Sequence, residues 1–219
     1  MSNSERRSQV WFAVLFFAAS ALLAAGLLAW DQPTLEAVRR GYGDHWRGLA
    51  GALSFYGDFP WLLGAGLLGL VVAWFGGSRS WSRIFTAMIL ASIVAGLLSN
   101  LIKLGTGRVR PRVEEVAHGW YGTVHGEQLV ALQHGFQAFP SSHAACAFGF
   151  FIPLFFARRG WGSLGLLAAA AVAWSRVQLN AHHISDVAAG GLLGLIVGWY
   201  AWRWIVQRGA LARWLDPAD

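Results

Sequence analysis

Apolar runs of membrane-crossing length alternate with polar segments along the 219 residues of the chain. Hydropathy predicts a membrane helix for each of six such runs. They are residues 10–30, 59–75, 84–102, 138–157, 161–174 and 187–202. The last three are short, so we expect polar flanking residues at the membrane edge, where polar side chains indicate function. The pattern predicts an all-α integral membrane bundle of six transmembrane helices.

Two polar segments, 31–58 and 103–138, are much longer than the others and fall on the same predicted side of the membrane. Within the first, apolar and aromatic residues recur near one face of a helix. They are Leu35, Val38, Tyr42 and Trp46, with basic residues among them. This composition predicts an amphipathic helix lying in the membrane interface. No repeat or low-complexity linker divides the chain, so we expect one membrane-embedded domain, 1–219.

The first apolar run, 10–30, follows a charged start and therefore also resembles a signal peptide. The run is too long for the apolar part of such a peptide, and no small-residue cleavage site follows it without a charged residue intervening. We expect it to be a retained helix.

Composition supports a membrane protein and narrows its partners. The chain is 56% hydrophobic and only 13% charged, whereas soluble domains carry nearly twice that charged fraction. The net charge of +6 comes mainly from scattered arginines rather than a basic block, so we expect no nucleic-acid partner. The single cysteine, Cys146, excludes an intramolecular disulfide. Basic residues occur on both predicted sides, and anion binding would explain those beside the two long polar segments.

The first polar patch is KLGTGRVRP, which begins at Lys103 and ends at Pro111. Lys103 and Arg110 are seven residues apart, a spacing that returns to the same face of a helix. A compact ammonium and a planar guanidinium together suit a tetrahedral anion such as phosphate. Taken alone, the patch also fits ordinary basic anchoring beside a membrane helix.

The second patch is PSSHAACAF, which begins at Pro140. Ser141 or Ser142 can cap a helix that continues into the apolar run. The free N–H groups and partial positive charge of a helix N-terminus favour an anion, and His143 would lie beside it in the first turn. The alternative is a simple cap with an incidental histidine at the interface.

The third patch is SRVQLNAHHISD, residues 175–186. Arg176 precedes His182 by six residues, and Asp186 follows it by four. On a helix, this spacing lets the carboxylate of Asp186 hold one ring nitrogen of His182 and leave the other free. His183 would point about a quarter turn away and lack that partner, so the spacing favours His182. The alternative is a hydrogen-bonded polar cluster between helices.

Together the patches read K-x6-RP, PSSH and SR-x5-H-x3-D on one predicted side. This set closely resembles the three-part signature of the type 2 phosphatidic acid phosphatase superfamily, in its integral membrane lipid phosphatase branch. The resemblance covers about residues 84–202, and three ordered motifs are far more specific than one. Ser142 stands where the family most often has glycine, although its backbone N–H remains at that position.

The residues and the resemblance imply phosphoryl transfer through a phosphohistidine. His182 would be the nucleophile, oriented by Asp186, and His143 the general acid. The phosphoryl oxygens would be bound by a further group of residues: Lys103, Arg110, Ser141, Ser142 and Arg176. We expect no metal or other cofactor, since these cations supply the positive charge and no carboxylate cluster suggests Mg²⁺.

The implied substrate is a lipid phosphomonoester or diphosphate, such as undecaprenyl diphosphate, phosphatidylglycerophosphate, phosphatidic acid or a lipid A phosphate. The resemblance and the short chain fit a hydrolase of the bacterial cell envelope, in the inner membrane, with its site facing the periplasm or exterior. Three alternatives remain. They are a lipid phosphotransferase using the same intermediate, a non-catalytic anion or lipid transporter, and a vanadate-dependent haloperoxidase.

Other conspicuous residues have simpler interpretations. The histidines at 45, 118, 125 and 134 are predicted to be solvated loop residues. Cys146 is predicted to be a small packing residue. Four glycines in the last apolar run should allow close helix packing. They are Gly190, Gly191, Gly194 and Gly198.

Overall fold

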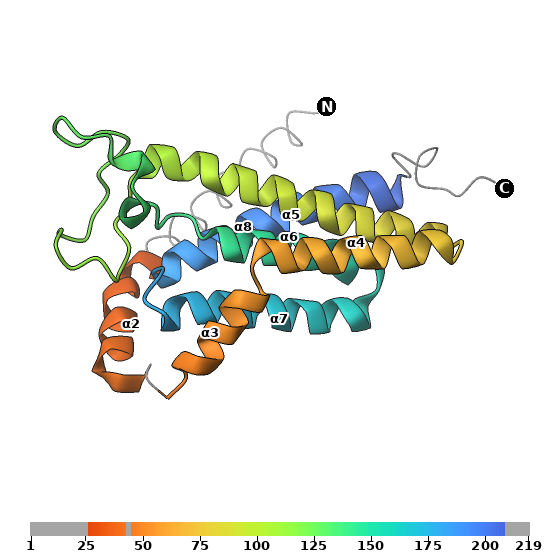
Figure 1. Ribbon diagram of the computed structural model, residues 1–219, viewed down its shortest axis with the longest axis horizontal. Helices are drawn as coiled ribbons and strands as arrows, with labels where there is room; N and C mark the ends of the chain where they lie inside the picture. Colours follow the sequence, from red (N-terminus) through yellow and green to blue (C-terminus); the bar gives the residue numbers. More distant parts are fainter. Residues whose placement is uncertain (1–25, 43–44, 209–219) are drawn as a thin grey trace, which may run out of the picture.

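The computed structural model describes residues 26–42 and 45–208, and every extended regular element among them is helical. Five long helices run side by side along the long axis of the molecule (Figure 1). They are α4 (Phe59–Phe75), α5 (Arg79–Thr106), α6 (Ser142–Ala157), α7 (Arg159–Gln178) and α8 (Ile184–Ala201). The all-α prediction is confirmed.

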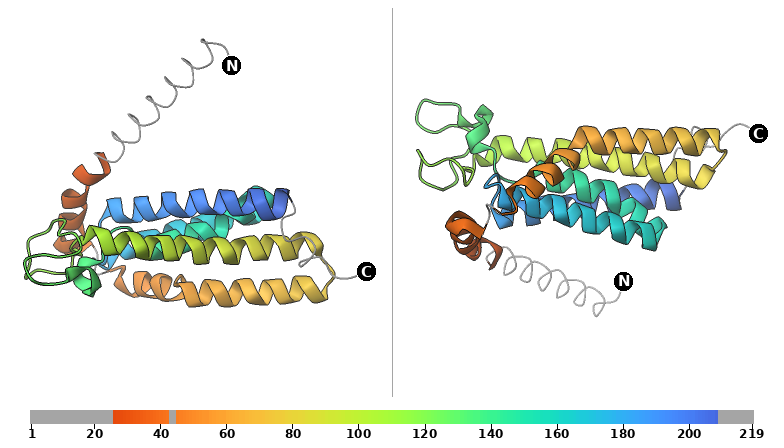
Figure 2. Two further views of the ribbon diagram at one scale, coloured as in Figure 1. Left: turned by 90° about the horizontal axis from the view of Figure 1, so that it is seen from above. Right: turned by 60° about the horizontal axis from the view of Figure 1, so that its bottom comes forward.

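Shorter helices and one long loop complete the described part of the chain. The short helices are α2 (Asp31–Ala37), η1 (Val38–Tyr42), α3 (Arg47–Tyr56), η2 (Val130–Leu132), η3 (His134–Phe136) and η4 (Trp202–Gln207). Helix α2 and the segment 107–137 lie at the same end of the bundle in both views of Figure 2. That end also holds the polar patches found in the sequence.

The prediction of six spans is not confirmed. Among the described residues, two helical stretches are long and apolar enough to cross a membrane: α5, and α8 continued by η4. The pair α3 and α4 would make a third span, although it bends by 49° at the break. Helix α6 has only 16 residues, and α7 carries arginine near both ends of an alanine-rich stretch. Most of the predicted span 10–30 lies outside the described residues.

The predicted amphipathic helix is two separate helical pieces. The chain leaves the helical conformation at Gly41, where φ is 100°, and α3 begins at Arg47. Leu35 and Val38 are buried in the protein rather than presented as an apolar face. The prediction of a single helix was wrong. Gly41 adopts a positive φ, which ends the helix, although the helical spacing of apolar residues continues beyond it.

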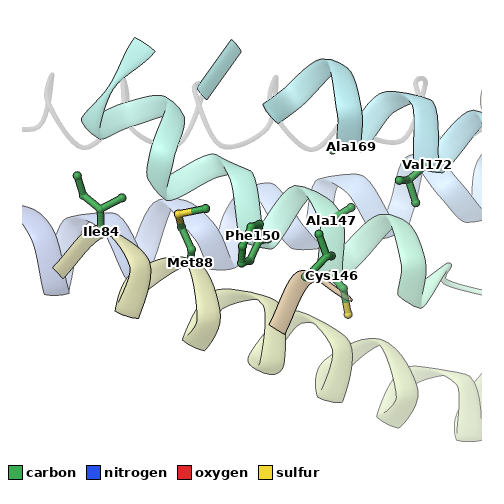
Figure 3. Packing of buried hydrophobic residues seen from close by; sticks show 8 residues of the cluster. Ile84, Met88, Cys146, Ala147, Phe150, Ala169 and Val172 are labelled. Carbon is green, nitrogen blue, oxygen red and sulfur yellow. The ribbon is translucent and has the colours of Figure 1, made fainter. Parts of the chain in front are cut away.

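The core is formed where α6 packs against α5, α7 and α8. Figure 3 shows its buried side chains, among them Ile84 and Met88 from α5, Phe150 and Cys146 from α6, and Val172 from α7. Cys146 is a packing residue there, as predicted. Exposed leucines on the outer faces of α5 and α8, such as Leu101 and Leu192, suit a lipid environment.

Glycine brings α8 into backbone contact with α6. A Cβ atom on Gly190 would lie 2.3 Å from the carbonyl oxygen of Ser141, and one on Gly194 would lie 2.5 Å from that of Ala145. The backbone N–H of Ser141 also donates to the carbonyl of Asp186, at 3.0 Å. The predicted role of these glycines in close packing is confirmed. The contact fixes the second polar patch against the third.

Candidate active site

The three polar patches line one cavity of about 450 Å³ at the end of the bundle where the loop 107–137 lies. Six of the predicted site residues are in its lining: Lys103, Arg110, Ser142, His143, Arg176 and His182. Ser141 and Asp186 are fully buried behind the wall and do not line it. These six residues are up to 79 positions apart in the sequence, from Lys103 to His182.

Lys103 lies in the last turn of α5 and is 6% exposed. Its Nζ donates to the hydroxyl of Ser142 and lies 3.4 Å from Oδ1 of Asn100. The Ser142 hydroxyl also lies 2.9 Å from the same Asn100 oxygen. The sequence indicated only the Ser142 backbone N–H as a ligand. The structure shows that its side chain contacts the lysine.

Arg110 and Arg176 bring two more cations to the cavity. Arg110 donates from Nη2 to the carbonyl of Gln137 at 3.2 Å, and Arg176 donates from Nη1 to the hydroxyl of Ser54. Each keeps a buried Nε without a hydrogen-bond partner among the described residues. Burial, reinforced by the nearby Arg112, lowers the pKa of Arg110 to about 10, so it stays charged at neutral pH. Unpaired buried donors of this kind suit an anionic ligand.

His182 is 2% exposed and lies just before α8. Its Nδ1 is 2.7 Å from the carbonyl oxygen of Ala138 and 3.8 Å from Oδ2 of Asp186. A carbonyl only accepts, so Nδ1 must carry the hydrogen, and Nε2 keeps its lone pair. Burial lowers the pKa of His182 to about 3, against the opposing effect of Asp186. The ring is therefore neutral at pH 7, as a nucleophile needs to be.

Asp186 is closer to His183 than to His182, which corrects the argument from spacing. Helix α8 begins at Ile184 with His183 as its N-cap, so His182 precedes the helix and the i,i+4 geometry does not apply. Oδ2 of Asp186 accepts from the His183 backbone N–H at 2.7 Å and lies 3.1 Å from its Nδ1. What distinguishes His182 is its place in the cavity wall, which His183 does not share.

His143 lies in the first turn of α6, which Ser141 caps by accepting from the backbone N–H of Ala144 at 3.5 Å. Nε2 of His143 is 3.4 Å from Oδ1 of Asp58. Ser142 and His143, in the first turn of this helix, line the same cavity as the three cations, and a helix start favours an anion. The Ser141 hydroxyl is already engaged in capping, so its predicted contact with phosphate remains a proposal.

Sequence reasoning missed Arg108, which connects the site to the rest of the fold. Arg108 is 6% exposed, and its guanidinium lies 2.5 Å from a carboxylate oxygen of Asp186 and 2.5 Å from one of Asp31. The ring of Trp120 lies 4.5 Å from the guanidinium carbon. Arg108 was visible in the first patch, but nothing in the sequence showed that Asp31 would approach it.

Three more cavity-lining residues lacked a sequence signal: Asp58, Asn100 and His134. Asp58 is the N-cap of α4, and Asn100 lies one turn before Lys103. His134, expected to be solvated, is exposed but also borders the cavity, where its Nδ1 lies 2.9 Å from Nη2 of Arg112. Polar residues on three separate elements therefore complete the wall.

The model of the PAP2 superfamily matches residues 82–210, which is more than half of the chain and includes all three motifs. The protein belongs to this superfamily, as its motifs indicated.

Three relatives show how far the similarity extends. Lipid phosphate phosphatase 1 of Arabidopsis thaliana is 28% identical over 139 residues, which are 53% of this chain and 42% of that protein. The bacitracin transport permease protein BcrC of Bacillus licheniformis is 30% identical over 131 residues, 59% of either chain. Lipid A 1-phosphatase of Rhizobium etli is 26% identical over 211 residues, 87% of this chain and 82% of that one. The chain thus spans about half the length of the first two.

Two solved structures share the fold. A transmembrane PAP2-type phosphatidylglycerolphosphate phosphatase from Bacillus subtilis has a TM-score of 0.61 and 20% identity, covering 86% of this chain and 92% of its own. LpxE of Aquifex aeolicus has a TM-score of 0.53 and 16% identity, covering 78% and 93%. The bundle is therefore the membrane PAP2 phosphatase fold.

Proposed function

We propose that the protein is a membrane lipid phosphatase that hydrolyses a lipid phosphomonoester or diphosphate. One observation carries this proposal most strongly. Three cations, of which Lys103 and Arg110 are buried, and the two motif histidines line a single cavity. No ion pair joins Lys103, Arg110 or Arg176 to a carboxylate in the described part of the chain. Positive charge without a protein counter-ion suits a phosphate group.

The proposed reaction has two steps. The Nε2 lone pair of His182 attacks phosphorus, the bond from phosphorus to the lipid oxygen breaks, and His143 gives that oxygen a proton. Water then attacks the phosphohistidine, His143 takes a proton from the water, and inorganic phosphate leaves. The Ala138 carbonyl supports this assignment because it holds the hydrogen on Nδ1. Asp186 lies 3.8 Å from the same nitrogen and would stabilise the ring as it becomes positive.

The three cations would stabilise the negative charge of the phosphoryl oxygens. Lys103, Arg110 and Arg176 are held by neighbouring hydroxyl and carbonyl groups, so their positions need little rearrangement during the reaction. The backbone N–H groups of Ser142 and His143 would add the donors of a helix start.

A lipid substrate fits the surroundings of the cavity and the relatives. The cavity wall includes Leu97, which is exposed on the outer face of α5. Two relatives are named as a lipid phosphate phosphatase and a lipid A 1-phosphatase. We place the protein in the bacterial inner membrane as a single domain, with its cavity facing the periplasm or exterior.

The test is inorganic phosphate release by the purified protein in detergent from a panel of lipid monophosphates and diphosphates. We expect release by the wild type, and a loss of about 10²–10⁴-fold in His143→Gln if that residue transfers the proton. No release from any lipid, with or without a second lipid as phosphoryl acceptor, would contradict the proposed function. Release that requires the acceptor would identify a phosphotransferase instead.

A further inference from the structure

Asp58 enters the cavity from outside the part of the chain that the superfamily model matches. It lies at the break between α3 and α4, while the match covers residues 82–210. Its Oδ1 accepts from the backbone N–H of Phe59 at 2.8 Å and lies 3.4 Å from Nε2 of His143. One carboxylate oxygen therefore both starts a helix and faces the proposed general acid.

The carboxylate of Asp58 lies among positively charged groups that surround His143. Lys103 faces it from α5, Arg176 from α7 and Arg110 from the loop, and two further histidines line the same cavity, His134 and His182. Among the described residues that line the cavity, Asp58 is the one acidic side chain. Burial and the three cations lower the pKa of His143, and the nearby carboxylate of Asp58 acts in the opposite direction. A general acid must hold its proton at the pH where it works.

The two ring nitrogens of His143 have different surroundings. Nε2 lies at ion-pair distance, 3.4 Å, from Oδ1 of Asp58, and neither ring nitrogen forms a hydrogen bond with a described residue. In the protonated ring, Nε2–H would therefore stay with the carboxylate, and Nδ1–H would be free for another acceptor. After Nδ1 gives up its proton, the ring is neutral with its remaining hydrogen on Nε2.

We propose that Asp58 is a positioning residue that orients His143 and stabilises its protonated form for transfer of a proton from Nδ1 to the leaving oxygen. The inference rests on the proposed phosphatase function. The same pairing returns the system to its starting state, because Nδ1 accepts a proton from the water that attacks the phosphohistidine. Asp58 forms no bond to the substrate and acts through His143 alone.

The decisive variant is Asp58→Asn, because asparagine caps a helix as well as aspartate does. The start of α4 is thus preserved while the negative charge is removed. The control is Glu36→Gln, which removes one negative charge from an exposed position on α2. The measurement is the pH profile of kcat/KM on a lipid phosphate, with the melting temperature of each variant.

We expect the alkaline decline of the profile to begin about one pH unit lower in Asp58→Asn, because loss of an opposite charge releases the proton earlier. Asp58→Glu should restore part of the difference, and Glu36→Gln should keep the wild-type profile. The rate loss should also be smaller for 4-nitrophenyl phosphate than for an alkyl phosphate, since a good leaving group needs little protonation. An unchanged profile and an equal loss on both esters would overturn the proposal.

A second measurement separates this proposal from the proposed function. NMR titration of ¹⁵N-labelled histidine, with His143→Gln to assign the signal, reports the protonation of His143 without any turnover. Two changes in Asp58→Asn would support the pairing, even if no lipid releases phosphate. The titration midpoint of His143 should be lower, and at pH values above the midpoint the hydrogen of the neutral ring should no longer be confined to Nε2. An identical midpoint and tautomer in both proteins would overturn it.

Discussion

Replacing Asp31 by alanine should destabilise the protein strongly, although Asp31 lies outside all three motifs. Asp31 is 5% exposed, and its carboxylate contacts the guanidinium of Arg108 at 2.5 Å. It also accepts from the backbone N–H of Ser185 at 3.0 Å and from its hydroxyl at 2.7 Å. The substitution therefore removes one charge-assisted contact and leaves two buried donors without their acceptor.

The expected loss follows from the burial of these groups. Removing one partner of a buried ion pair costs about 3–5 kcal/mol. Arg108 keeps its second carboxylate, Asp186, which favours the lower end of that range, but the unpaired donors of Ser185 add about 1–3 kcal/mol. The total is therefore about 4–6 kcal/mol. At about 2–4 °C per kcal/mol for a chain of this size, the melting temperature should fall by ~8–24 °C.

The assay is thermal unfolding in detergent followed by tryptophan fluorescence. Glu36→Ala is the matched control, because Glu36 lies on the same helix and its pair with Arg40, at 2.9 Å, is exposed on both sides. Such a pair contributes about 0.3–0.5 kcal/mol, so this variant should melt within ~2 °C of the wild type. Equal small shifts in the two variants would refute the argument that the buried network holds α2 to the start of α8.

Three further predictions test the packing and the charges of the site. Gly190→Ala should lower both the melting temperature and the rate of phosphate release, because its Cβ would lie 2.3 Å from the Ser141 carbonyl oxygen, whereas Gly64→Ala, with open space around it, should change neither. Burial lowers the pKa of His182 to about 3 from 6.5, so between these pH values the histidine binds a proton in the unfolded chain but not in the folded one. Melting temperatures should therefore fall as the pH drops from 7.5 to 5, and they should fall less steeply in His182→Ala. In steady-state kinetics Lys103→Gln should lower kcat by about 10²-fold or more, and a rate within twofold of the wild type would argue against its contact with the phosphoryl group.

The sequence was sufficient for the parts of the site that local chemistry determines. The motif residues Lys103, Arg110, His143 and His182 were predicted from the three polar patches, and all of them line one cavity. The close packing at Gly190 was also predicted, because small residues in an apolar run have few other uses.

Long-range contacts explain what the sequence could not show. Asp31 and Asp58 reach the site only because α2 and the start of α4 lie at the same end of the bundle as the motifs. Asp186 was assigned to His182 on the assumption that the helix extended through both residues. Helix α8 instead starts at Ile184, and the Asp186 side chain turns back to the N-cap residue His183. The spacing rule failed at the helix boundary, which sequence patterns locate poorly.

The most direct test of His182 as the nucleophile compares three proteins in one experiment: the wild type, His182→Ala and His183→Asn. Phosphate release from the preferred lipid would be measured in detergent with EDTA present, and asparagine would preserve the cap of α8. We predict release by the wild type and by His183→Asn, and a loss of at least about 10³-fold in His182→Ala. Release by His182→Ala at the wild-type rate, or a loss confined to His183→Asn, would contradict this prediction.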